Sequence, residues 1–258
     1  MNGFDPYDAL VPVYLETEIP QRCRQLGTAV FVEVQGEPFL YSAAHVFDEG
    51  KHGRLLAPTQ YGLLTIEGYI GYVDLPPDMS RAEDQADVAY CRLSSRFSAA
   101  LRHHFQPLPQ DRREIIASAL DLTVCSASGY PASKSKKNAE GMHSSTIFSF
   151  RGVAAEREVY ESLDLSPESS IALHFHKKQA VDPSTGKAFP TPALNGISGG
   201  GIFAWPKGHE TSKDWELPKL VGIVHSFKEK EGLIIGSSLI FFLPMLVLGR
   251  MKGFGSIP

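Results

Sequence analysis

The segment NGISGGGIF at 195–203 is the starting point for interpreting this chain. Gly196 lies two residues before Ser198, and three consecutive glycines follow it. Glycines in this arrangement free the backbone N–H groups around a serine to converge on one point, as an oxyanion site requires. Taken alone, the segment is equally compatible with a flexible turn.

Two earlier segments contain residues that could act together with this serine. SAAHVF at 42–47 places His45 directly after an apolar strand, and QADVAY at 85–90 places Asp87 directly before one. A lone histidine is more often a core or turn residue, and an aspartate at a strand start usually bonds its own backbone. Asp84 is a rival carboxylate; we prefer Asp87 because the strand begins immediately after it.

Together, the order His45, Asp87, Ser198 resembles the trypsin-like (chymotrypsin-fold) serine peptidases. In that family a histidine ends a strand as AAH, an aspartate opens D-[IV]-A, and the nucleophile lies in GxSGG. The opening strand GTAVFV and the turn GYP at 129–131 also match. The resemblance covers about residues 27–248, nearly the whole chain.

The resemblance implies an all-β fold of two packed antiparallel six-stranded β-barrels, with the site in the cleft between them. Many short strand-like runs separated by turns support this class, and the alternation of Val30, Val32 and Val34 indicates one face of a strand. We expect one peptidase domain over 1–258, divided into an amino-terminal extension (1–26), a first barrel (about 27–100), a connection (95–118), a second barrel (about 119–237) and a carboxy-terminal helix (238–250).

The family pattern also assigns roles. Ser198 is the expected nucleophile, His45 the general base and then acid, and Asp87 the orienting carboxylate. The N–H groups of Gly196 and Ser198 are expected to hold the oxyanion. An imidazole with an ordinary pKa of about 6.5 is mostly neutral at pH 7 and can accept the serine proton. Turnover is therefore expected to rise as His45 loses its proton, with a midpoint near about 6–7.5.

The chain departs from the digestive and clotting relatives at the nucleophile. Ile197 replaces an aspartate that pairs with a newly cleaved amino terminus, and Gly201 replaces a common proline. An isoleucine cannot make that ion pair, so activation by amino-terminal trimming is not supported. The departures resemble the intracellular and bacterial branches without disulfides, and leave open whether a partner protein shapes the loop.

The substrate pocket is expected to be neutral or apolar. Its walls would be 190–194, 225–227 and 232–234, with Pro192, His225, Phe227 and Gly232 as candidate residues. None of these offers a carboxylate, so a preference for Arg or Lys is not supported. Glutamate-cleaving relatives place a histidine near this strand, but His225 lies one position later, which turns a strand side chain to the other face and toward Asp87 as an alternative.

Composition narrows the functional class. The 25 basic and 29 acidic residues give a net charge of −4, which does not indicate nucleic-acid binding. Three cysteines, Cys23, Cys91 and Cys125, are an odd and widely spaced set and favour a reducing, cytoplasmic compartment. We expect a protein or peptide substrate, an activating protein as an open alternative, and neither a cofactor nor a membrane.

Two further patterns in the sequence each allow two interpretations. His174 and His176 form H-x-H in a strand, but no third ligand is evident, so surface histidines are the better interpretation than a metal site. Residues 232–249 carry no charge, yet Pro244 and small residues interrupt the run, which favours a buried strand and a helix over a membrane span. No secretory signal is evident at the amino terminus.

The predicted function is a serine endopeptidase that forms an acyl-enzyme on Ser198. The alternative is a catalytically silent binding or scaffold module that keeps the fold, motivated by Ile197 and the three glycines. A protein tethered to a membrane through 232–249 is the third hypothesis.

Overall fold

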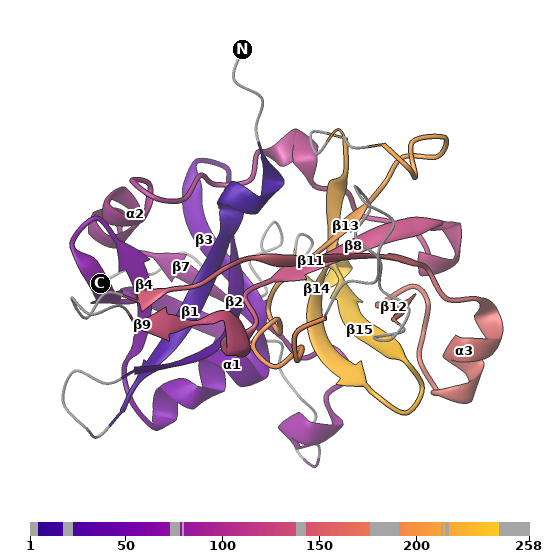
Figure 1. Ribbon diagram of the computed structural model, residues 1–258, viewed down its shortest axis with the longest axis horizontal. Coiled ribbons are helices and arrows are strands. Elements are labelled where there is room, and N and C mark those ends of the chain that lie inside the picture. Colours follow the sequence, from indigo (N-terminus) through magenta and orange to yellow (C-terminus); the bar gives the residue numbers. More distant parts are fainter. Residues whose placement is uncertain are drawn as a thin grey trace.

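Two antiparallel β-sheets lie side by side in the structure, a computed structural model (Figure 1). The structure describes residues 5–17, 23–72, 78, 80–137, 143–175, 191–212, 214 and 217–242. The first sheet has seven strands in the order β5-β4-β1-β2-β3-β7-β6, and the second has six in the order β11-β8-β13-β14-β15-β12. The predicted all-β class is confirmed.

The first sheet is built from consecutive segments of the amino-terminal half. Its strands are β1 (Leu10–Glu16), β2 (Cys23–Val34), β3 (Glu37–Ala43), β4 (Leu55–Thr59), β5 (Gly62–Thr65), β6 (Gly68–Tyr72) and β7 (Val88–Leu93). In β2, Val30 and Val32 belong to one apolar cluster and Phe31 to another. The alternation in the sequence therefore separates two buried faces, not a buried face from a wet one.

Two expectations for this sheet are corrected. It contains seven strands instead of six, because the chain bends at Ile66 and Glu67 and divides one extended segment into β5, paired with β4, and β6, paired with β7. The sheet also begins at Leu10 instead of near residue 27, because β1 pairs with β2 along its length. Residues 10–16 are thus a strand of the sheet and not an external extension.

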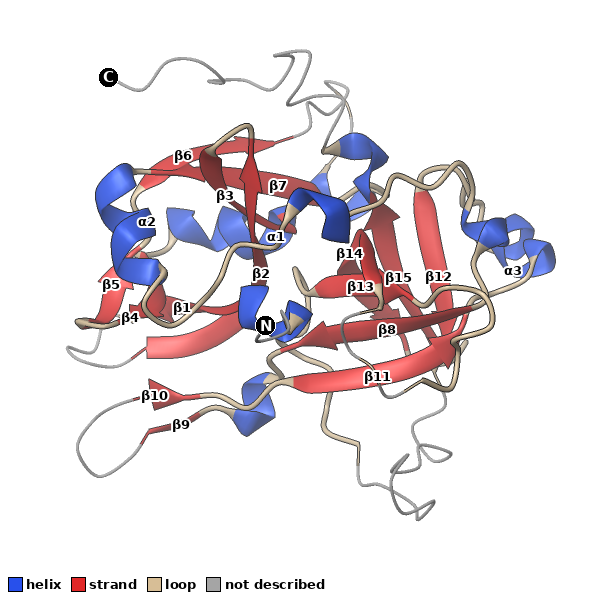
Figure 2. Cartoon of the chain, turned by 90° about the horizontal axis from the view of Figure 1, so that it is seen from above, coloured by secondary structure: helices blue, strands red, loops and turns tan. Residues whose placement is uncertain are grey.

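The second sheet is assembled from the carboxy-terminal half. Its strands are β8 (Val124–Gly129), β11 (Phe148–Val153), β12 (Ser170–His174), β13 (Gly201–Ala204), β14 (Lys219–Lys228) and β15 (Leu233–Ser238). An antiparallel bridge between Ala154 and Leu173 joins its two outer strands, so the sheet curls back on itself. A short ribbon, β9 (Lys136–Lys137) and β10 (His143–Ser144), extends from it to the side of β1 (Figure 2).

Helices are few and short. They are α1 (Ala44–Asp48), α2 (Ser95–Leu101) and α3 (Arg157–Ser162), with 3-10 turns at Pro6–Ala9, Glu49–Lys51, Arg81–Glu83, Gln110–Arg112, Ala119–Asp121, Ala132–Lys134 and Leu239–Phe241. Of the expected helix over 238–250, the described part is the last of these 3-10 turns, and residues 243–250 lie outside the described residues. Within the described residues, no helix has the length and apolarity to cross a membrane.

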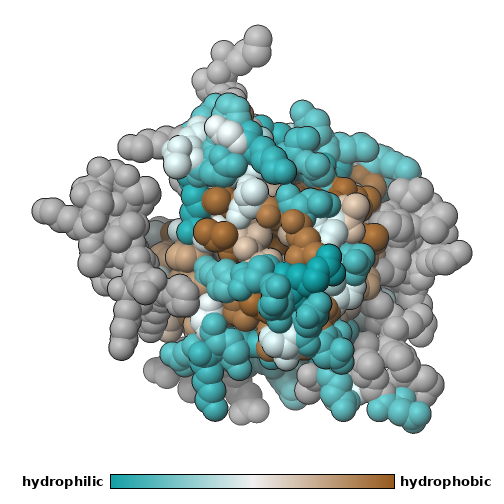
Figure 3. Space-filling view, turned by 90° about the vertical axis from the view of Figure 1, so that its right-hand side faces the viewer, coloured by the Kyte–Doolittle hydropathy of each residue, from teal (hydrophilic) through white to brown (hydrophobic). Residues whose placement is uncertain are grey.

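Apolar side chains from both sheets meet at the junction. One buried cluster combines Val30 and Tyr41 of the first sheet with Phe203 and Ile223 of the second. The connection that was expected over 95–118 follows this junction, since Leu108 bridges to β2 and Arg113 bridges to Leu220 of β14. On the face that carries α3 and β12, apolar residues are interspersed with polar ones (Figure 3).

Candidate active site

His45 and Asp87, which are 42 residues apart in the chain, are in direct contact. His45 lies on α1, directly after β3, and Asp87 directly precedes β7, which pairs with β3. The distance between His45 Nδ1 and Asp87 Oδ2 is 2.5 Å. The Asp87 side chain is 11% exposed and that of His45 is 45% exposed, so a buried carboxylate supports an imidazole that solvent can reach.

The backbone around Asp87 is shaped to make this contact. Asp87 has a φ of 40°, in the left-handed region that non-glycine residues rarely adopt. Its carboxylate Oδ1 accepts the N–H of His45 at 2.9 Å, and its carbonyl accepts the N–H of Ala44 at 2.9 Å. Three contacts with the start of α1 therefore offset the strain at this residue.

The rival carboxylate, Asp84, has other partners. Its Oδ2 pairs with the Arg81 guanidinium at 2.5 Å, and its Oδ1 accepts the N–H of Ala86 at 3.0 Å. Arg81 also pairs with Asp48 at 3.2 Å. Asp84 therefore organises the turn that leads into β7, and the histidine is paired with Asp87.

Ser198 lies in the turn before β13, half-buried. Its hydroxyl donates to the carbonyl of His225 on β14 at 3.2 Å. Within the described residues, no hydrogen bond joins the Ser198 hydroxyl to His45. The structure thus brings His45 and Asp87 together directly, while Ser198 meets the strand that follows it.

Backbone contacts fix the loop before Ser198. The carbonyl of Asn195 accepts the N–H of Ala132 at 2.7 Å, and the carbonyl of Gly196 accepts the hydroxyl of Thr28 at 3.0 Å. Gly196 has a φ of 96°, which suits glycine. Within the described residues, the N–H groups of Gly196 and Ser198 donate to no other group, so both remain available to an oxyanion.

Ile197, the residue that departs from the family pattern, is buried in the core of the second sheet. It is 4% exposed and shares an apolar cluster with Leu194 and Val221. Its N–H donates to the carbonyl of Leu194 at 3.0 Å. Apolar burial therefore anchors this loop in the core of the second sheet.

The glycines after Ser198 allow the two sheets to approach each other closely. The carbonyl of Ser198 accepts the N–H of Thr28 at 2.8 Å, and a Cβ on Gly27 would lie 2.8 Å from that carbonyl oxygen. Gly199, with a φ of 82°, donates its N–H to the carbonyl of Val224 at 2.6 Å. A Cβ on Gly199 would lie 1.9 Å from the carbonyl oxygen of Thr28.

The predicted pocket residues divide into two groups. Pro192 is buried, and Phe227 packs edge-on against Phe175 with ring centroids 5.4 Å apart. Gly232 has a φ of 65° and forms the turn between β14 and β15, where its carbonyl accepts the N–H of Phe175 at 2.7 Å. Pro192, Phe227 and Gly232 thus each have a role in packing or in a turn. Residues 176–190, which include Pro190, lie outside the described residues.

His225, the fourth, has a different environment. Its Nδ1 lies 2.6 Å from the Ser226 hydroxyl, and its Nε2 is buried without a hydrogen-bond partner. Burial lowers the pKa of His225 to about 4, against the opposing effect of the Asp87 carboxylate. The alternative that His225 approaches Asp87 stays a prediction, since the hydrogen-bond partner of its ring is Ser226.

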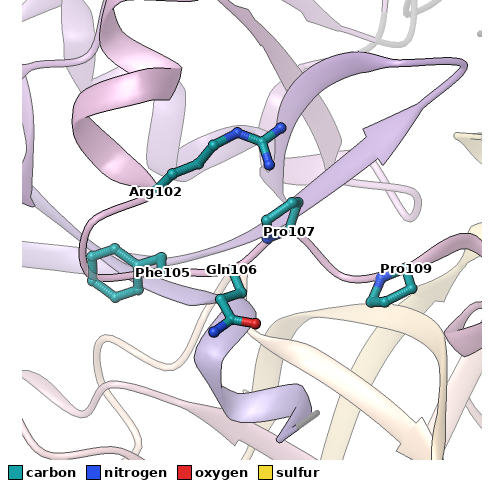
Figure 4. A pocket seen from close by; sticks show the side chains of 5 residues that line it. All are labelled: Arg102, Phe105, Gln106, Pro107 and Pro109. Atoms are coloured by element: carbon teal, nitrogen blue, oxygen red, sulfur yellow. The ribbon is translucent and has the colours of Figure 1, made fainter. Parts of the chain in front are cut away.

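A surface hollow is lined by none of the predicted site residues. Arg102, Phe105, Gln106, Pro107 and Pro109 line it, on the segment that connects the two sheets (Figure 4). None of these five residues belongs to the predicted site. Arg102 is already paired with Glu33 at 2.5 Å, so the hollow offers no free charged group.

The candidate metal ligands do not assemble in the part of the chain that the structure describes. His174 pairs with Glu156, with 3.0 Å between His174 Nε2 and Glu156 Oε2, and His176 lies outside the described residues. No group of three or more His, Cys, Asp or Glu side chains suited to a metal ion occurs among the described residues.

Comparison with known proteins gives similarity of structure alone. No protein-family model and no curated protein matches this chain. One similar solved structure is a thermostable serine protease from an extremophilic microorganism, with 14% identity, a TM-score of 0.49 and coverage of 91% of each chain. Another comes from work on the coupled folding and binding of the intrinsically disordered VPg protein of Sesbania mosaic virus, with 15% identity, a TM-score of 0.48 and coverage of 91% of this chain and 87% of that chain. The account of the site therefore depends on the contacts described above.

Two residues that support the site had not been singled out from the sequence. The Thr28 hydroxyl accepts the N–H of Tyr130 at 2.8 Å while donating to Gly196, and its carbonyl accepts the Ser42 hydroxyl at 2.7 Å. The threonine in the apolar run GTAVFV could have indicated this role, because a hydroxyl in such a run is expected to be buried and a buried hydroxyl needs a hydrogen-bond partner. Thr28 is indeed fully buried. The contribution of Ala132 comes through its backbone N–H and leaves no signal in the sequence.

Proposed function

We propose that the protein is a serine endopeptidase that forms an acyl-enzyme on Ser198. The observation that carries the proposal is the contact of His45 Nδ1 with a buried aspartate at 2.5 Å. That contact fixes the imidazole tautomer, leaves Nε2 as the free base and stabilises the imidazolium that forms. The proposed mechanism needs no cofactor, and its substrate is a peptide bond in a protein or peptide.

The attacking step needs one side-chain rotation. In the structure the Ser198 hydroxyl donates to the carbonyl of His225. The proposed attack requires a rotation about χ1 that breaks this hydrogen bond and lets Oγ donate to His45 Nε2. The barrier to rotation of a serine side chain between staggered rotamers is much lower than the barrier to a covalent step. Proton transfer to His45 would then accompany attack on the carbonyl carbon, with the N–H groups of Gly196 and Ser198 holding the oxyanion.

Labelling by a fluorophosphonate probe tests the nucleophile. The wild-type chain should react in a time-dependent way, and Ser198→Ala should not react. Asp87→Asn should label roughly 10³–10⁴-fold more slowly, because a neutral amide no longer selects the working tautomer. Asp84→Asn is the matched control, since Asp84 pairs with Arg81, and it should keep most of the reactivity. Equal labelling of the wild-type chain and Ser198→Ala would refute the proposal.

A silent binding or scaffold module is the second candidate. It is favoured by one observation, that the Ser198 hydroxyl contacts the His225 carbonyl instead of His45. Peptidase assays with and without added partner proteins separate the two functions, because a switchable enzyme gains turnover and a scaffold does not. As the compartment we propose the cytoplasm, supported by the buried Cys91 and Cys125, which form no disulfide.

A further inference from the structure

Two polar side chains of β2, in the first sheet, are buried against backbone of the second half of the chain. Thr28 is fully buried and Gln25 is 8% exposed. A buried polar group is costly without a hydrogen-bond partner, so such groups are almost always paired. The partners of these two side chains therefore show which backbone groups β2 holds in place.

Tyr130, directly after β8, is held by both of its backbone groups. Its N–H donates to the Thr28 hydroxyl at 2.8 Å, and its carbonyl accepts the side-chain amide Nε2 of Gln25. The peptide groups on the two sides of the Tyr130 Cα are therefore both fixed relative to β2. Ala132, two residues later, begins from a backbone that the first sheet has already placed.

The direction of the Thr28 hydrogen bonds is determined by its partners. A backbone N–H can only donate, so the Thr28 oxygen accepts from Tyr130 and its one proton is free for another acceptor. That acceptor is the carbonyl of Gly196, at 3.0 Å. The hydroxyl thus joins the segment after β8 to the loop before Ser198.

Gln25 is itself fixed by two hydroxyls. Because the carbonyl of Tyr130 can only accept, Gln25 presents its NH₂ group there, and its Oε1 accepts the Ser145 hydroxyl at 2.6 Å. The Ser145 oxygen lies 2.6 Å from the Tyr14 hydroxyl, which is left as the donor. Ser145 follows β10 of the ribbon beside β1 (Figure 2), so the amide of Gln25 has one defined orientation.

The contacts with β2 determine the direction of the Gly196 N–H. The peptide before the Gly196 Cα is held by the N–H of Ala132 on the Asn195 carbonyl, at 2.7 Å, and the peptide after it is held by the Thr28 hydroxyl. A glycine with a φ of 96° has little conformational preference of its own, so these two contacts set its backbone angles. One contact comes from β2 directly, and the other comes through Tyr130.

Thr28 also connects this loop with the elements that carry the other two candidate catalytic residues. Its N–H donates to the carbonyl of Ser198 at 2.8 Å, and its carbonyl accepts the Ser42 hydroxyl at 2.7 Å. Ser42 lies in β3, three residues before His45. One residue therefore contacts the loop, the serine and the strand that leads to the histidine.

We propose that Gln25 and Thr28 are positioning residues, which hold the N–H groups of Gly196 and Ser198 at a fixed place relative to His45. This inference rests on the proposed function, since the place of these donors matters only if Ser198 forms an oxyanion intermediate. Both side chains act through backbone that they hold and not through the substrate. A misplacement of about 1 Å can lower a rate by about 10²-fold, so the clamp is expected to affect kcat.

Hydrogen exchange of single amides, followed by nuclear magnetic resonance in the full chain, tests the clamp without requiring activity. It is measured in Ser198→Ala, alone and combined with Thr28→Val or Gln25→Met. Each replacement keeps the approximate shape of the side chain and removes its polar contacts. Exchange of the Ala132 N–H should become about tenfold faster in both, whereas that of the Trp205 N–H, bonded elsewhere in the second sheet, should stay unchanged.

Thr59 offers a matched control for the kinetics. It is 3% exposed, and its hydroxyl likewise accepts one backbone N–H, from Tyr61 at 3.2 Å, and donates to one carbonyl, of Gly62 at 3.0 Å. Thr59→Val should therefore destabilise the fold for the same reason but leave kcat unchanged. Thr28→Val should lower kcat about tenfold with little change in KM, and Thr28→Ser, which keeps the hydroxyl, should restore it.

The outcomes separate this inference from the proposed function. Gln25→Met should lower kcat in the same direction, and it carries both measurements if Thr28→Val fails to fold. Unchanged exchange of the Ala132 N–H in every folded variant would overturn the inference, as would an active chain in which Thr28→Val keeps the kcat of Thr59→Val. If exchange responds but the wild-type chain does not react with the fluorophosphonate, the proposed function fails and the clamp on the loop stands.

Discussion

At the scale of single residues, the site depends on side chains held in unusual environments. Asp87 adopts a left-handed backbone conformation, and its carbonyl and carboxylate are both bound to the first residues of α1. His225 lies in a partly buried β-bulge, and burial of its ring lowers its pKa to about 4. The backbone of Asp87 is strained and the ring of His225 is desolvated. Because burial lowers the pKa of His225, the free energy of unfolding depends on pH.

His225 should make the fold sensitive to acid. Its pKa is lowered to about 4 in the folded chain against about 6.5 when unfolded, so the unfolded state binds more protons between these values. The stabilisation is complete above pH 6.5 and is lost as the pH falls toward 4, by up to about 3 kcal/mol. Urea unfolding at pH 7 and pH 4.5 should show a smaller difference for His225→Gln than for the wild type.

The matched control for that measurement is His174→Gln. His174 is partly exposed and paired with the exposed Glu156, so its replacement should leave the difference between the two pH values nearly unchanged. Equal differences for the wild type and His225→Gln would show that His225 is not a neutral buried histidine.

Residues whose chemistry depends on their type were predictable from the sequence. A histidine after a strand, an aspartate before one and a serine among glycines are each ambiguous, but their order identified His45, Asp87 and Ser198 as candidates. Ala132 was not predictable, because any residue except proline supplies the same N–H. His225 was noticed, but its bulge depends on register, which the sequence alone does not fix.

At the scale of elements, the loop before Ser198 is the decisive one. The N–H of Ala132 holds the carbonyl of Asn195, and so fixes the peptide that carries the Gly196 N–H. Ala132→Pro removes this donor alone, since Ala132 follows an extended Pro131 and begins a 3-10 turn, where proline is tolerated. We expect kcat to fall by up to about 10²-fold, the effect of weakening one oxyanion donor, with Ala132→Gly as the control that keeps the N–H. Equal activity of the two variants would contradict this account.

The turn after Ser198 tests how closely the two sheets approach. Gly199 and Gly208 share a φ of 82°, but a Cβ on Gly199 would lie 1.9 Å from the Thr28 carbonyl oxygen, whereas Gly208 has nothing within 4 Å. Gly208→Ala should therefore lose only about 1 kcal/mol of unfolding free energy from backbone strain. Gly199→Ala should lose more than about 4 kcal/mol or fail to fold. Similar urea midpoints for the two variants would refute the close approach.

Among the strands that the sequence did not predict, β1 and β4 each contain a proline, a residue that usually interrupts a sheet. Pro12 lies in β1 and Pro58 in β4, and those strands pair with each other only at Tyr14–Leu56 and Leu15–Leu55. Each proline therefore sits where one side of its strand has no neighbour, and the missing N–H costs no ladder hydrogen bond. That exception depends on the stagger between strands, which a local pattern does not contain.

At the scale of the whole molecule, the candidate site lies where the two sheets meet. His45 and Asp87 come from the first sheet, Ser198 and His225 from the second, and their relative position depends on the apolar cluster at the junction. The connecting segment crosses this junction, where the N–H of Glu114 donates to the carbonyl of Leu220 at 2.9 Å. The sequence indicated that a connection exists over 95–118, but not that it packs along both sheets.

Arg113 in that segment is buried with little compensation, and this leads to a prediction about the junction. It is 8% exposed, its Nη2 donates to the carbonyl of Glu33 at 2.7 Å, and its Nε and Nη1 have no partner in the described chain. Burial accordingly lowers the pKa of the guanidinium. Because an apolar side chain of similar length removes this desolvation penalty, Arg113→Met should leave the unfolding free energy unchanged or raise it by up to about 2 kcal/mol. Arg113→Ala should lower it by about 2 kcal/mol or more, since it leaves a cavity between the sheets. Urea unfolding measures both, and a methionine variant as unstable as the alanine variant would show that the charge itself holds the sheets together.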